Sequence, residues 1–499
     1  MVTTYEQWRD RAARVTPRNE LFIDGAFVPA ADGATFATVG PRDGRELARI
    51  SAAGDTDVDR AVRAARTAFE DRRWADASPR HRKKVLLRFS ALIREHLEEL
   101  ALLETLDVGK PIGESLRVDV PGAANCVQWY AEAVDKIYDE IAPTGADALA
   151  MITREPLGVV GAVVPWNYPL MITSWKIAPA LAMGNSVVLK PAEQSSLSAL
   201  VLAELAVEAG IPDGVFNVVP GLGPVAGAAL GRHQEVDKIA FTGSTGTGRR
   251  FLEYSAQSNG KQVALELGGK SPQVVLADTE DLDAAASAIA WGIFYNAGQT
   301  CNAGSRLLAD ARVMDDLLAG VVKVAEDIRV GDPLDPDTQM GAIVDQAQLD
   351  RVLGYLALGR DEGGQVVTGG DRVRAESGGY FVAPTVLHGV DNDARVAQEE
   401  IFGPVLTTTT FTSEDEAVRL ANRTRYGLAA SVWTARLGTA HRVARALRAG
   451  TVWVNTFDAS DVITPFGGFK DSGSGRDKSL HALDAYSALK TTWINVGNS

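Results

Sequence analysis

The sequence predicts an α/β protein with two domains. Short β-branched segments alternate with helical segments from Gly158 to about Val454. This alternation is typical of βαβ units, whose parallel strands form a sheet covered by helices on both faces. The length of 499 residues also exceeds what one compact core usually holds. We therefore expect two α/β domains in sequence, with the segment around Glu266 at their junction.

The part of the chain ahead of about residue 150 is expected to be rich in helix. A helix that Asp55 and Thr56 can cap carries apolar residues on one face. These apolar residues are Val58, Ala61, Val62, Ala65 and Phe69. A second, long helical stretch is expected from about His81 to Thr105.

The first α/β series is predicted to begin after Gly158. Its strands are expected at 159–164, 186–189, 215–219 and 238–241. Its helices are expected near 171–183, 195–209, 224–230 and 247–258. A second series of the same kind is predicted from Gln273 to about Val454.

Two segments fit neither series. Residues 137–153 form an excursion between a helix and the first sheet, and Ser487–Val496 is a β-prone tail. Exposed β segments normally pair with another strand. We expect this tail to pair within an oligomer.

Composition excludes several classes of function. The formal net charge of −14 gives the chain no attraction to a polyanion, so we expect no nucleic-acid partner. The two cysteines, Cys126 and Cys301, cannot form a disulfide framework, which favours a reducing compartment. Residues 1–12 lack the apolar segment of a secretory signal, and no uncharged apolar run of membrane-spanning length is present. We expect a cytoplasmic protein without a membrane partner.

The run 293–301 ends in Cys301, which is a candidate nucleophile. A free thiol is only partly ionised at neutral pH and would need activation. The alternative is a small buried hydrophobic residue. Upstream, Glu266 precedes a glycine pair in an apolar stretch and is a candidate base. The six histidines are scattered, with neither an HExxH motif nor paired Cys or His spacing, so no metal site is predicted.

Three further segments follow predicted strands. Segment 241–248 places glycines where a strand turns into a helix, so its backbone can approach a phosphate; a tight turn is the alternative. Segment 221–223 matches the phosphate-binding fingerprint less well. Segment 190–193 ends in Glu193, which can bind ribose hydroxyls together with Lys190 or simply stabilise a helix N-terminus.

The segment 165–169 holds Asn167 between two prolines. Its side-chain N–H can stabilise a developing oxyanion, and the alternative is that Asn167 caps the following helix.

Taken together and in order, seven motifs resemble the NAD(P)-dependent aldehyde dehydrogenase superfamily over nearly the whole chain. The motifs are 165–169, 190–193, 241–248, 266–270, 298–301, 399–404 and 465–468. The resemblance implies an aldehyde dehydrogenase-like fold with a Rossmann-like NAD-binding domain, an α/β catalytic domain and a small β oligomerisation element. These parts would span 1–136 with 154–265, then 266–474, and finally 137–153 with 475–499. The resemblance also implies that the protein forms a homodimer or homotetramer.

The resemblance implies a role for each matching residue. Cys301 would be the nucleophile, Glu266 the general base and Asn167 an oxyanion donor, with Lys176 as a helper near the thioester. Glu266 argues for hydrolysis, because members that transfer the acyl group to coenzyme A generally lack this base. Many members carry Glu where this chain has Asp477, whose shorter reach puts a proton-moving role in doubt. The implied cofactor-binding residues are Val164, Pro165, Trp166, Lys190, Glu193, Gly223, Gly243, Ser244, Leu267, Glu399 and Phe402.

The implied substrate is a small aldehyde. The segments 475–483, 129–133 and 107–111 are similar to the branch that oxidises aminobutyraldehyde derivatives, including γ-glutamyl-γ-aminobutyraldehyde. Asp458 and Asp461 would make the entrance of the substrate site acidic, and an acidic entrance would attract an amino or guanidino group. The alternative is that these two residues are solvated carboxylates of a loop. The implied substrate residues are Asp107, Tyr168, Trp175, Asp458 and Asp461. Asp107 can instead be structural or lie near a monovalent cation site.

Alternative functions remain open at this point. Betaine aldehyde or general aliphatic and aromatic aldehydes are other substrates for the same fold. A catalytically silent member and a thiol hydrolase without redox chemistry are the alternatives from other classes. For the cofactor, Glu193 favours NAD over NADP, because a carboxylate on the ribose hydroxyls repels a 2′-phosphate.

Overall fold

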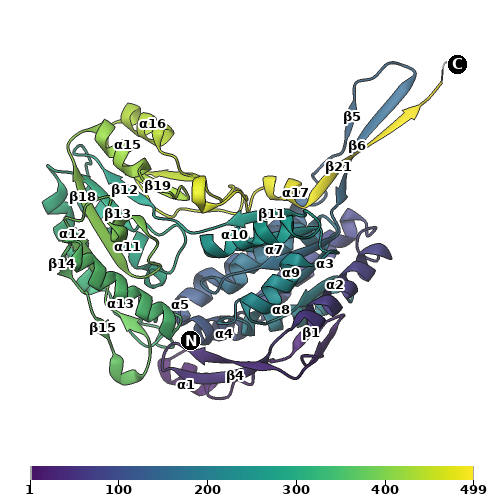
Figure 1. The fold of residues 1–499 in the computed structure, drawn as a ribbon, viewed down its shortest axis with the longest axis horizontal. Coiled ribbons are helices and arrows are strands. Elements are labelled where there is room, and N and C mark those ends of the chain that lie inside the picture. Colours follow the sequence, from purple (N-terminus) through teal and green to yellow (C-terminus); the bar gives the residue numbers. More distant parts are fainter. Residues whose placement is uncertain (1–2, 498–499) are drawn as a thin grey trace.

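The computed structural model describes residues 3–497, and its α/β fold consists of two lobes and a projecting arm (Figure 1). Each lobe is built around a seven-stranded sheet. The predicted α/β class is confirmed. The predicted domain boundaries stay predictions, and their outermost residues, 1–2 and 498–499, lie outside the described part of the chain.

The first sheet has the strand order β11-β10-β7-β8-β9-β1-β2. Its strands are β1 (Leu21–Ile23), β2 (Ala26–Val28), β7 (Val159–Val163), β8 (Ser186–Lys190), β9 (Phe216–Val218), β10 (Lys238–Thr242) and β11 (Gln262–Glu266). The five strands from β7 to β11 are parallel, and β1 with β2 completes an antiparallel edge. Every residue of β7, β8 and β10 is buried, which explains their continuous apolar sequences.

Helices cover both faces of the first sheet and form two hydrophobic clusters. One cluster includes residues of α2 (Asp55–Glu70), α9 (Ala228–Arg232) and α10 (Thr245–Ala256). The other includes α3 (Pro79–Glu95), α4 (Leu97–Val108), α6 (Val120–Ala133), α7 (Pro169–Ala182) and α8 (Leu197–Ala209). The shorter elements of this lobe are α1 (Tyr5–Ala12), α5 (Ile112–Glu114), η1 (Ser115–Asp119) and η2 (Gly223–Gly227).

The second sheet has the strand order β14-β17-β18-β13-β12-β19-β20. Its strands are β12 (Pro272–Val275), β13 (Arg306–Asp310), β14 (Gln365–Thr368), β17 (Thr385–His388), β18 (Val405–Phe411), β19 (Ala429–Trp433) and β20 (Thr451–Val454). Only the β14–β17 pair is antiparallel. The packed helices are α11 (Leu282–Phe294), α12 (Met314–Asp327), α13 (Gln346–Asp361), α14 (Arg395–Gln398), α15 (Glu414–Asn422) and α16 (Leu437–Ala446).

The arm is a three-stranded antiparallel sheet in the order β21-β6-β5, and it projects from the first lobe in Figure 1. Its strands are β5 (Glu140–Ala142), β6 (Ala148–Pro156) and β21 (Ser487–Asn495). The β-prone tail therefore pairs with β6 of its own chain, over nine residues, rather than only within an oligomer. The outer edges of β21 and β5 are the remaining unpaired edges of this sheet.

The N-terminal part of the chain differs from the prediction in two ways. Its residues 3–51 contain four strands, including the hairpin of β3 (Thr35–Gly40) and β4 (Arg45–Ser51), and the strands β1 and β2 are too short to show a periodicity. The long helix expected from His81 to Thr105 divides at His96, whose φ and ψ of −94° and 21° are not helical. The remaining small elements are η3 (Tyr295–Gly298), β15 (Arg372–Val373), η4 (Ala375–Ser377), β16 (Phe381–Val382), η5 (Lys470–Ser472) and α17 (His481–Ala485).

Among the helices of residues 3–497, none combines the length and the apolar composition that crossing a membrane requires.

Candidate active site

Two cavities meet at Cys301, which lines both. The larger cavity has a volume of about 620 Å³ and the smaller cavity about 260 Å³. Cys301 follows η3, a turn in which Asn296, Ala297 and Gly298 have positive φ angles of 49°, 54° and 70°. A Cβ atom on Gly298 would lie 2.1 Å from the carbonyl oxygen of Gly403, so only glycine fits there. This tight turn places the thiol where the two cavities join.

The smaller cavity lies at the carboxyl ends of the parallel strands of the first sheet. After β7 it is lined by Pro165, Trp166 and Asn167. The rings of Trp166 and Phe402 meet edge to face at 5.2 Å, so one wall comes from each lobe. The remaining predicted residues on this wall are Gly243, Ser244 and Leu267. Such strand-end crevices are where open α/β sheets bind ligands.

The N-terminus of α10 opens beside the smaller cavity. Ser244 caps this helix by accepting a hydrogen bond from the backbone N–H of Thr247 at 3.3 Å. Gly246, in the first turn, has no atom within 4 Å of where a Cβ would stand. An uncrowded helix N-terminus with free backbone N–H groups suits a phosphate of a dinucleotide.

Four other predicted residues lie beside the smaller cavity without lining it. Lys190 ends β8 and donates a hydrogen bond to Glu193 Oε2 at 3.1 Å. Val164 is buried, and its N–H donates to the Lys190 carbonyl at 3.2 Å. Gly223 begins η2 after β9 and is open, because no atom lies within 4 Å of where its Cβ would stand. All four stand at the same sheet edge, because β7, β8 and β9 are parallel neighbours.

The structure corrects one predicted cofactor residue. Glu399 faces away from the cavity and bonds to Tyr355 Oη at 2.6 Å and Arg395 Nε at 3.0 Å. Its neighbour Glu400 lines the smaller cavity and accepts from the Gly269 N–H at 3.0 Å. The backbone at Glu399 is extended, so consecutive side chains point in opposite directions. The sequence signal was the Glu399-Glu400 doublet, which does not say which of the two faces inward.

The loop that carries Phe402 is fixed from α13. Gln348 Nε2 donates to the carbonyl oxygens of Ile401 and Phe402, each at 2.9 Å. Arg351 donates to the Glu400 carbonyl at 2.5 Å. Both side chains also line the smaller cavity, and sequence reasoning missed them, because no local pattern links α13 to residues 399–404.

Asn167 is buried against the turn that precedes Cys301. Its side-chain Nδ2 donates to the Gln299 carbonyl at 2.9 Å, and Asn296 Nδ2 donates to the Asn167 carbonyl at 3.2 Å. Within residues 3–497, the second N–H bond of this amide has no acceptor. This arrangement fixes the amide beside the smaller cavity, where it can donate to a developing oxyanion.

The Cys301 thiol is in an environment that disfavours the thiolate. Burial raises the pKa of Cys301 first, and the carboxyl groups of Glu400, Glu266 and Asp458 raise it further. The backbone N–H of Asn302 acts in the opposite direction. The resting thiol is therefore protonated, and the nucleophile requires a base or the positive charge of a bound cofactor.

Glu266 ends β11 and is buried in a slot of glycines. A Cβ on Gly467 or Gly475 would lie 2.7 Å or 2.9 Å from Glu266 Oε1, so side chains at these positions would displace the carboxyl group. Neither oxygen of Glu266 has a hydrogen-bond partner within residues 3–497. Burial and then the charge of Asp477 raise its pKa well above the usual value. A carboxyl group of this kind suits proton transfer.

Lys176 and Asp477 form a buried ion pair near Glu266, with Lys176 Nζ 2.6 Å from Asp477 Oδ2. The positive charge of Lys176 lowers the pKa of Glu266, while Asp477 raises it. The shorter side chain of Asp477 thus still reaches Lys176. The two charges of the pair therefore act in opposite directions on the pKa of Glu266.

The larger cavity is walled by loops and helices rather than strand ends. Four predicted substrate residues line it, namely Tyr168, Trp175, Asp458 and Asp461. Tyr168 Oη bonds to Thr300 Oγ1 at 3.0 Å, and Asn302 Nδ2 donates to Asp458 Oδ1 at 2.6 Å. Trp175 packs against Phe466, with ring centroids 5.3 Å apart. Lys478, Ser460 and Cys126 also line this cavity, although no sequence pattern linked them to it.

The prediction that Asp107 contacts the substrate is wrong. Asp107 is fully buried away from the larger cavity and accepts from the N–H of Leu197 at 3.0 Å and from Thr38 Oγ1 at 3.1 Å. It therefore fixes the start of α8, which is the structural alternative. Within residues 3–497, no group of three or more His, Cys, Asp or Glu side chains is arranged to hold a metal ion.

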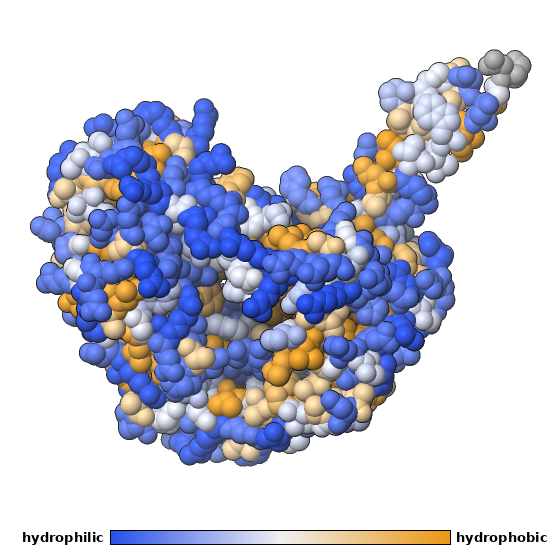
Figure 2. Space-filling view, in the orientation of Figure 1, coloured by the Kyte–Doolittle hydropathy of each residue, from blue (hydrophilic) through white to orange (hydrophobic). Residues whose placement is uncertain are grey.

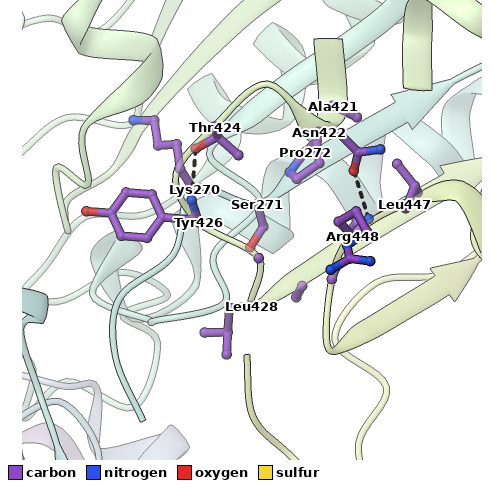
Figure 3. Close-up of a pocket in the computed structure, with 14 residues that line it drawn as sticks. Lys270, Ser271, Pro272, Ala421, Asn422, Thr424, Tyr426, Leu428, Leu447 and Arg448 are labelled. Atoms are coloured by element: carbon purple, nitrogen blue, oxygen red, sulfur yellow. Dashed lines mark hydrogen bonds between the residues drawn. The ribbon is translucent and has the colours of Figure 1, made fainter. Parts of the chain in front are cut away.

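Lys270, the last residue of the motif that begins at Glu266, lies in a separate small cavity (Figure 3). The backbone N–H of Arg448 donates to Asn422 Oδ1 at 2.7 Å on its wall. Its volume of about 10 Å³ holds no more than about one water molecule. This cavity is too small for a substrate, and Lys270 has no place among the candidate catalytic groups.

Comparison with known proteins gives this site its family. Residues 27–492 match the aldehyde dehydrogenase family, and the chain belongs to that family. It is 52% identical over 489 residues to the NADP/NAD-dependent aldehyde dehydrogenase PuuC of Escherichia coli, covering 98% of each chain.

Two solved structures are similar over almost the entire chain. The γ-glutamyl-γ-aminobutyraldehyde dehydrogenase of Burkholderia cenocepacia is 56% identical, with a TM-score of 0.97 and coverage of 99% of this chain and 100% of the other. An indole-3-acetaldehyde dehydrogenase in complex with NAD⁺ is 51% identical, with a TM-score of 0.98 and 99% coverage of both chains. The chain is thus an enzyme of aldehyde oxidation.

Proposed function

We propose that this enzyme oxidises an amino-terminated aldehyde to its carboxylic acid, with NAD as the hydride acceptor and water as the second reactant. The observation that carries the proposal is the junction of two cavities at one thiol, with the buried carboxyl group of Glu266 nearby. One cavity suits a dinucleotide and the other a small organic molecule. The names of the relatives support the same chemistry.

The residues around the smaller cavity fit NAD. The N-terminus of α10 would hold a phosphate, Glu400 a ribose hydroxyl, and Phe402 with Trp166 the nicotinamide side. Lys190 and Glu193 would bind the adenosine ribose, where the Glu193 carboxylate disfavours the 2′-phosphate of NADP. When bound, NAD supplies hydride acceptance next to Cys301.

The first chemical step belongs to Cys301 and Asn167. The Cys301 thiol gives its proton to the Glu266 carboxylate, which passes it on to solvent. Cys301 Sγ then bonds to the aldehyde carbon, and the carbonyl oxygen gains a negative charge. The free N–H of Asn167, with the backbone N–H of Cys301, stabilises this charge. Donors of this kind contribute about 2.7–4 kcal/mol in a site that excludes water. Departure of the hydride leaves a thioester on Cys301.

The second step belongs to Glu266. The ionised carboxylate removes a proton from water, whose oxygen attacks the thioester carbon and releases the acid and the Cys301 thiolate. The high pKa of Glu266 makes it an effective acceptor of that proton. Lys176 and Asp477 lie close enough to influence its charge and complete the polar surroundings.

The proposed substrates are aminoaldehydes such as γ-glutamyl-γ-aminobutyraldehyde and 4-guanidinobutyraldehyde. The carboxylates of Asp458 and Asp461 on the wall of the larger cavity favour a cationic group at the far end of the aldehyde. The aromatic wall of Trp175, Phe466 and Phe457 favours a second candidate, an apolar or quaternary ammonium aldehyde such as hexanal or betaine aldehyde.

Initial rates of NADH formation distinguish these candidates. The panel is 4-aminobutyraldehyde, 4-guanidinobutyraldehyde, γ-glutamyl-γ-aminobutyraldehyde, betaine aldehyde and hexanal, each with the wild type and Cys301→Ala. We expect higher kcat/KM for the amino-terminated aldehydes and no turnover in the variant. Equal or better rates with hexanal would remove the aminoaldehyde assignment and keep the chemistry. No NADH from any aldehyde would contradict the proposed reaction.

We also propose that the arm joins subunits into a homodimer or homotetramer. Leu489 and Trp493 of β21 are each 65% exposed, and Figure 2 shows apolar side chains at the base of the arm and at one of its edges. An exposed strand edge with apolar side chains normally has a partner. Light scattering gives the molecular mass of the wild type and of the double variant Leu489→Lys with Trp493→Lys, and we expect a smaller mass for the variant. An unchanged mass would show that the arm does not hold the subunits together.

A further inference from the structure

Lys478 is a charged side chain in the wall of the larger cavity that the proposed reaction does not use. It is 4% exposed, and its Nζ donates to Ser460 Oγ at 2.5 Å. Within residues 3–497, no carboxylate lies within ion-pair distance of this ammonium group. Burying an ammonium group without a direct anionic partner is unfavourable in free energy, and a bound anion would offset that penalty.

The surroundings of Lys478 hold it in one place. Its Nζ lies 5.2 Å from the ring centre of Trp175 and 5.5 Å from that of Phe466. The φ angles of Lys478 and Ser479 are 61° and 55°, a left-handed conformation that residues with side chains seldom adopt in succession. Strained backbone of this kind concentrates at ligand-binding sites. A purely structural cation–π contact is the competing explanation, and substitution of Lys478 separates the two.

The charges that line the larger cavity are of both signs. They are the carboxylates of Asp458 and Asp461 and the ammonium of Lys478. Asp458 acts electrostatically on both Cys301 and Lys478, and Asp461 and Asp477 also act on Lys478, although none of the three forms an ion pair with it among the described residues. A simple amine would occupy the carboxylates and leave the Lys478 ammonium without a hydrogen-bonded anion, whereas a simple carboxylate would meet two carboxylates. A zwitterionic group satisfies all three residues.

We propose that Lys478, with Ser460, binds a carboxylate at the far end of the aldehyde, while Asp458 and Asp461 take the ammonium group beside it. The preferred substrate is then an aldehyde that ends in an α-amino-acid group, such as a γ-glutamyl amide, rather than a plain ω-aminoaldehyde. This inference rests on the proposed function and narrows its substrate class.

A matched pair of aldehydes tests the carboxylate directly. The first is γ-glutamyl-γ-aminobutyraldehyde, and the second is N-(4-oxobutyl)-4-aminobutanamide, which differs only by lacking the α-carboxyl group. Both are measured with the wild type, Lys478→Met and Lys478→Arg. Methionine keeps most of the side-chain length without the charge, and arginine keeps the charge.

The expected result is selective. Lys478→Met lowers kcat/KM for the γ-glutamyl aldehyde by about tenfold or more, mainly through KM, as expected for a lost charge-assisted hydrogen bond. The same change alters the value for the decarboxylated aldehyde and for hexanal by less than about threefold, and Lys478→Arg recovers part of the loss. An equal loss on all three aldehydes means a structural role and overturns the proposal, as does no loss on any.

A binding measurement keeps the proposal separate from the proposed function. If the wild type oxidises hexanal but neither amino-terminated aldehyde, the aminoaldehyde function fails. The carboxylate site is then read from competitive inhibition of hexanal oxidation by γ-glutamylbutylamide and by 4-amino-N-butylbutanamide. Tighter inhibition by the γ-glutamyl compound in the wild type, lost in Lys478→Met, still supports the site; equal inhibition by both compounds rejects it.

Discussion

The smaller and larger cavities share Cys301 but are built in different ways. The smaller cavity takes most of its wall from short continuous runs at the ends of parallel strands, such as 165–167 and 243–244. The larger cavity draws single side chains from helices and loops that lie far apart along the chain, such as Trp175, Asp458 and Lys478. The fold fixes the proposed cofactor side through its backbone, whereas the proposed substrate side depends on side chains that can change one at a time. Substitutions should therefore separate by cavity.

Cys301 stands where the two cavities join, so its loss should give the largest effect. Cys301→Ala removes the atom that bonds to the substrate, and we expect the rate of NADH formation to fall by at least about a thousandfold. Cys126 is the matched control, because it is the other cysteine and lines the larger cavity. Cys126→Ala should keep the rate within about threefold. Comparable losses in both variants would refute the assignment of the nucleophile.

The loss of Glu266 should separate the two chemical steps. Glu266→Gln keeps the shape of the side chain but removes the base, so hydrolysis of the thioester should slow by about a hundredfold to ten-thousandfold. The first turnover does not need this hydrolysis, and solvent can take the Cys301 proton directly. Rapid mixing should show a burst of about one NADH per active site followed by a slow steady rate. A steady rate equal to the wild type would assign the base elsewhere.

The two adjacent glutamates test which wall of the smaller cavity binds the cofactor. Glu400 lines the cavity, and Glu399 bonds to Tyr355 and Arg395 outside it. Glu400→Gln should raise the KM for NAD by about tenfold, the scale of one lost hydrogen bond to a charged group. Glu399→Gln, as the matched control, should change it by less than about twofold. The reverse order would show that the side chains exchange places when the cofactor binds.

These pairs also show what the sequence could and could not predict. Pro165, Trp166 and Gly243 follow buried strands whose apolar runs are visible in the sequence, so both the strands and their ligand-facing ends were predictable. The choice between Glu399 and Glu400 depends on which way an extended residue points, and the motif contains both. The turn at Gly298 was expected only as part of a motif, because its contact with Gly403 joins distant segments.

The larger cavity was harder to predict for a physical reason. Asp107 lies in a segment that matches a substrate-specific branch, yet its carboxylate is used to fix the start of α8. Lys478 and Ser460 become partners only when the loop after β20 folds against the segment after Gly475. No spacing of residues along the sequence predicts such a contact. Short strands such as β1 and β2 were missed in the same way, since three residues carry too little periodicity.

The charges around Glu266 should set the pH dependence of the hydrolysis step. Because the pKa of Glu266 is raised, the carboxyl group is protonated below that pKa and acts as a base only above it, so the rate rises with pH. Asp477→Asn removes a charge that raises this pKa and should move the acidic limb of the kcat profile to lower pH. Lys176→Met removes a charge that lowers it and should move the limb to higher pH. Shifts in the same direction for both variants would contradict the electrostatic account.

The smallest expected effect concerns the choice between NAD and NADP. Glu193 is half-exposed beside the smaller cavity and holds Lys190 through a contact of 3.1 Å. Glu193→Gln removes the charge that repels a 2′-phosphate and frees Lys190 to attract it, so the ratio of kcat/KM for NADP over NAD should rise by about tenfold or less. Glu204, an exposed glutamate on α8 paired with Arg18, is the control, and Glu204→Gln should leave the ratio unchanged. Because this change touches only the cofactor side, the order of preference among the aldehydes should stay the same. A change in that order would mean that the two cavities are coupled through Cys301 more closely than their separate walls suggest.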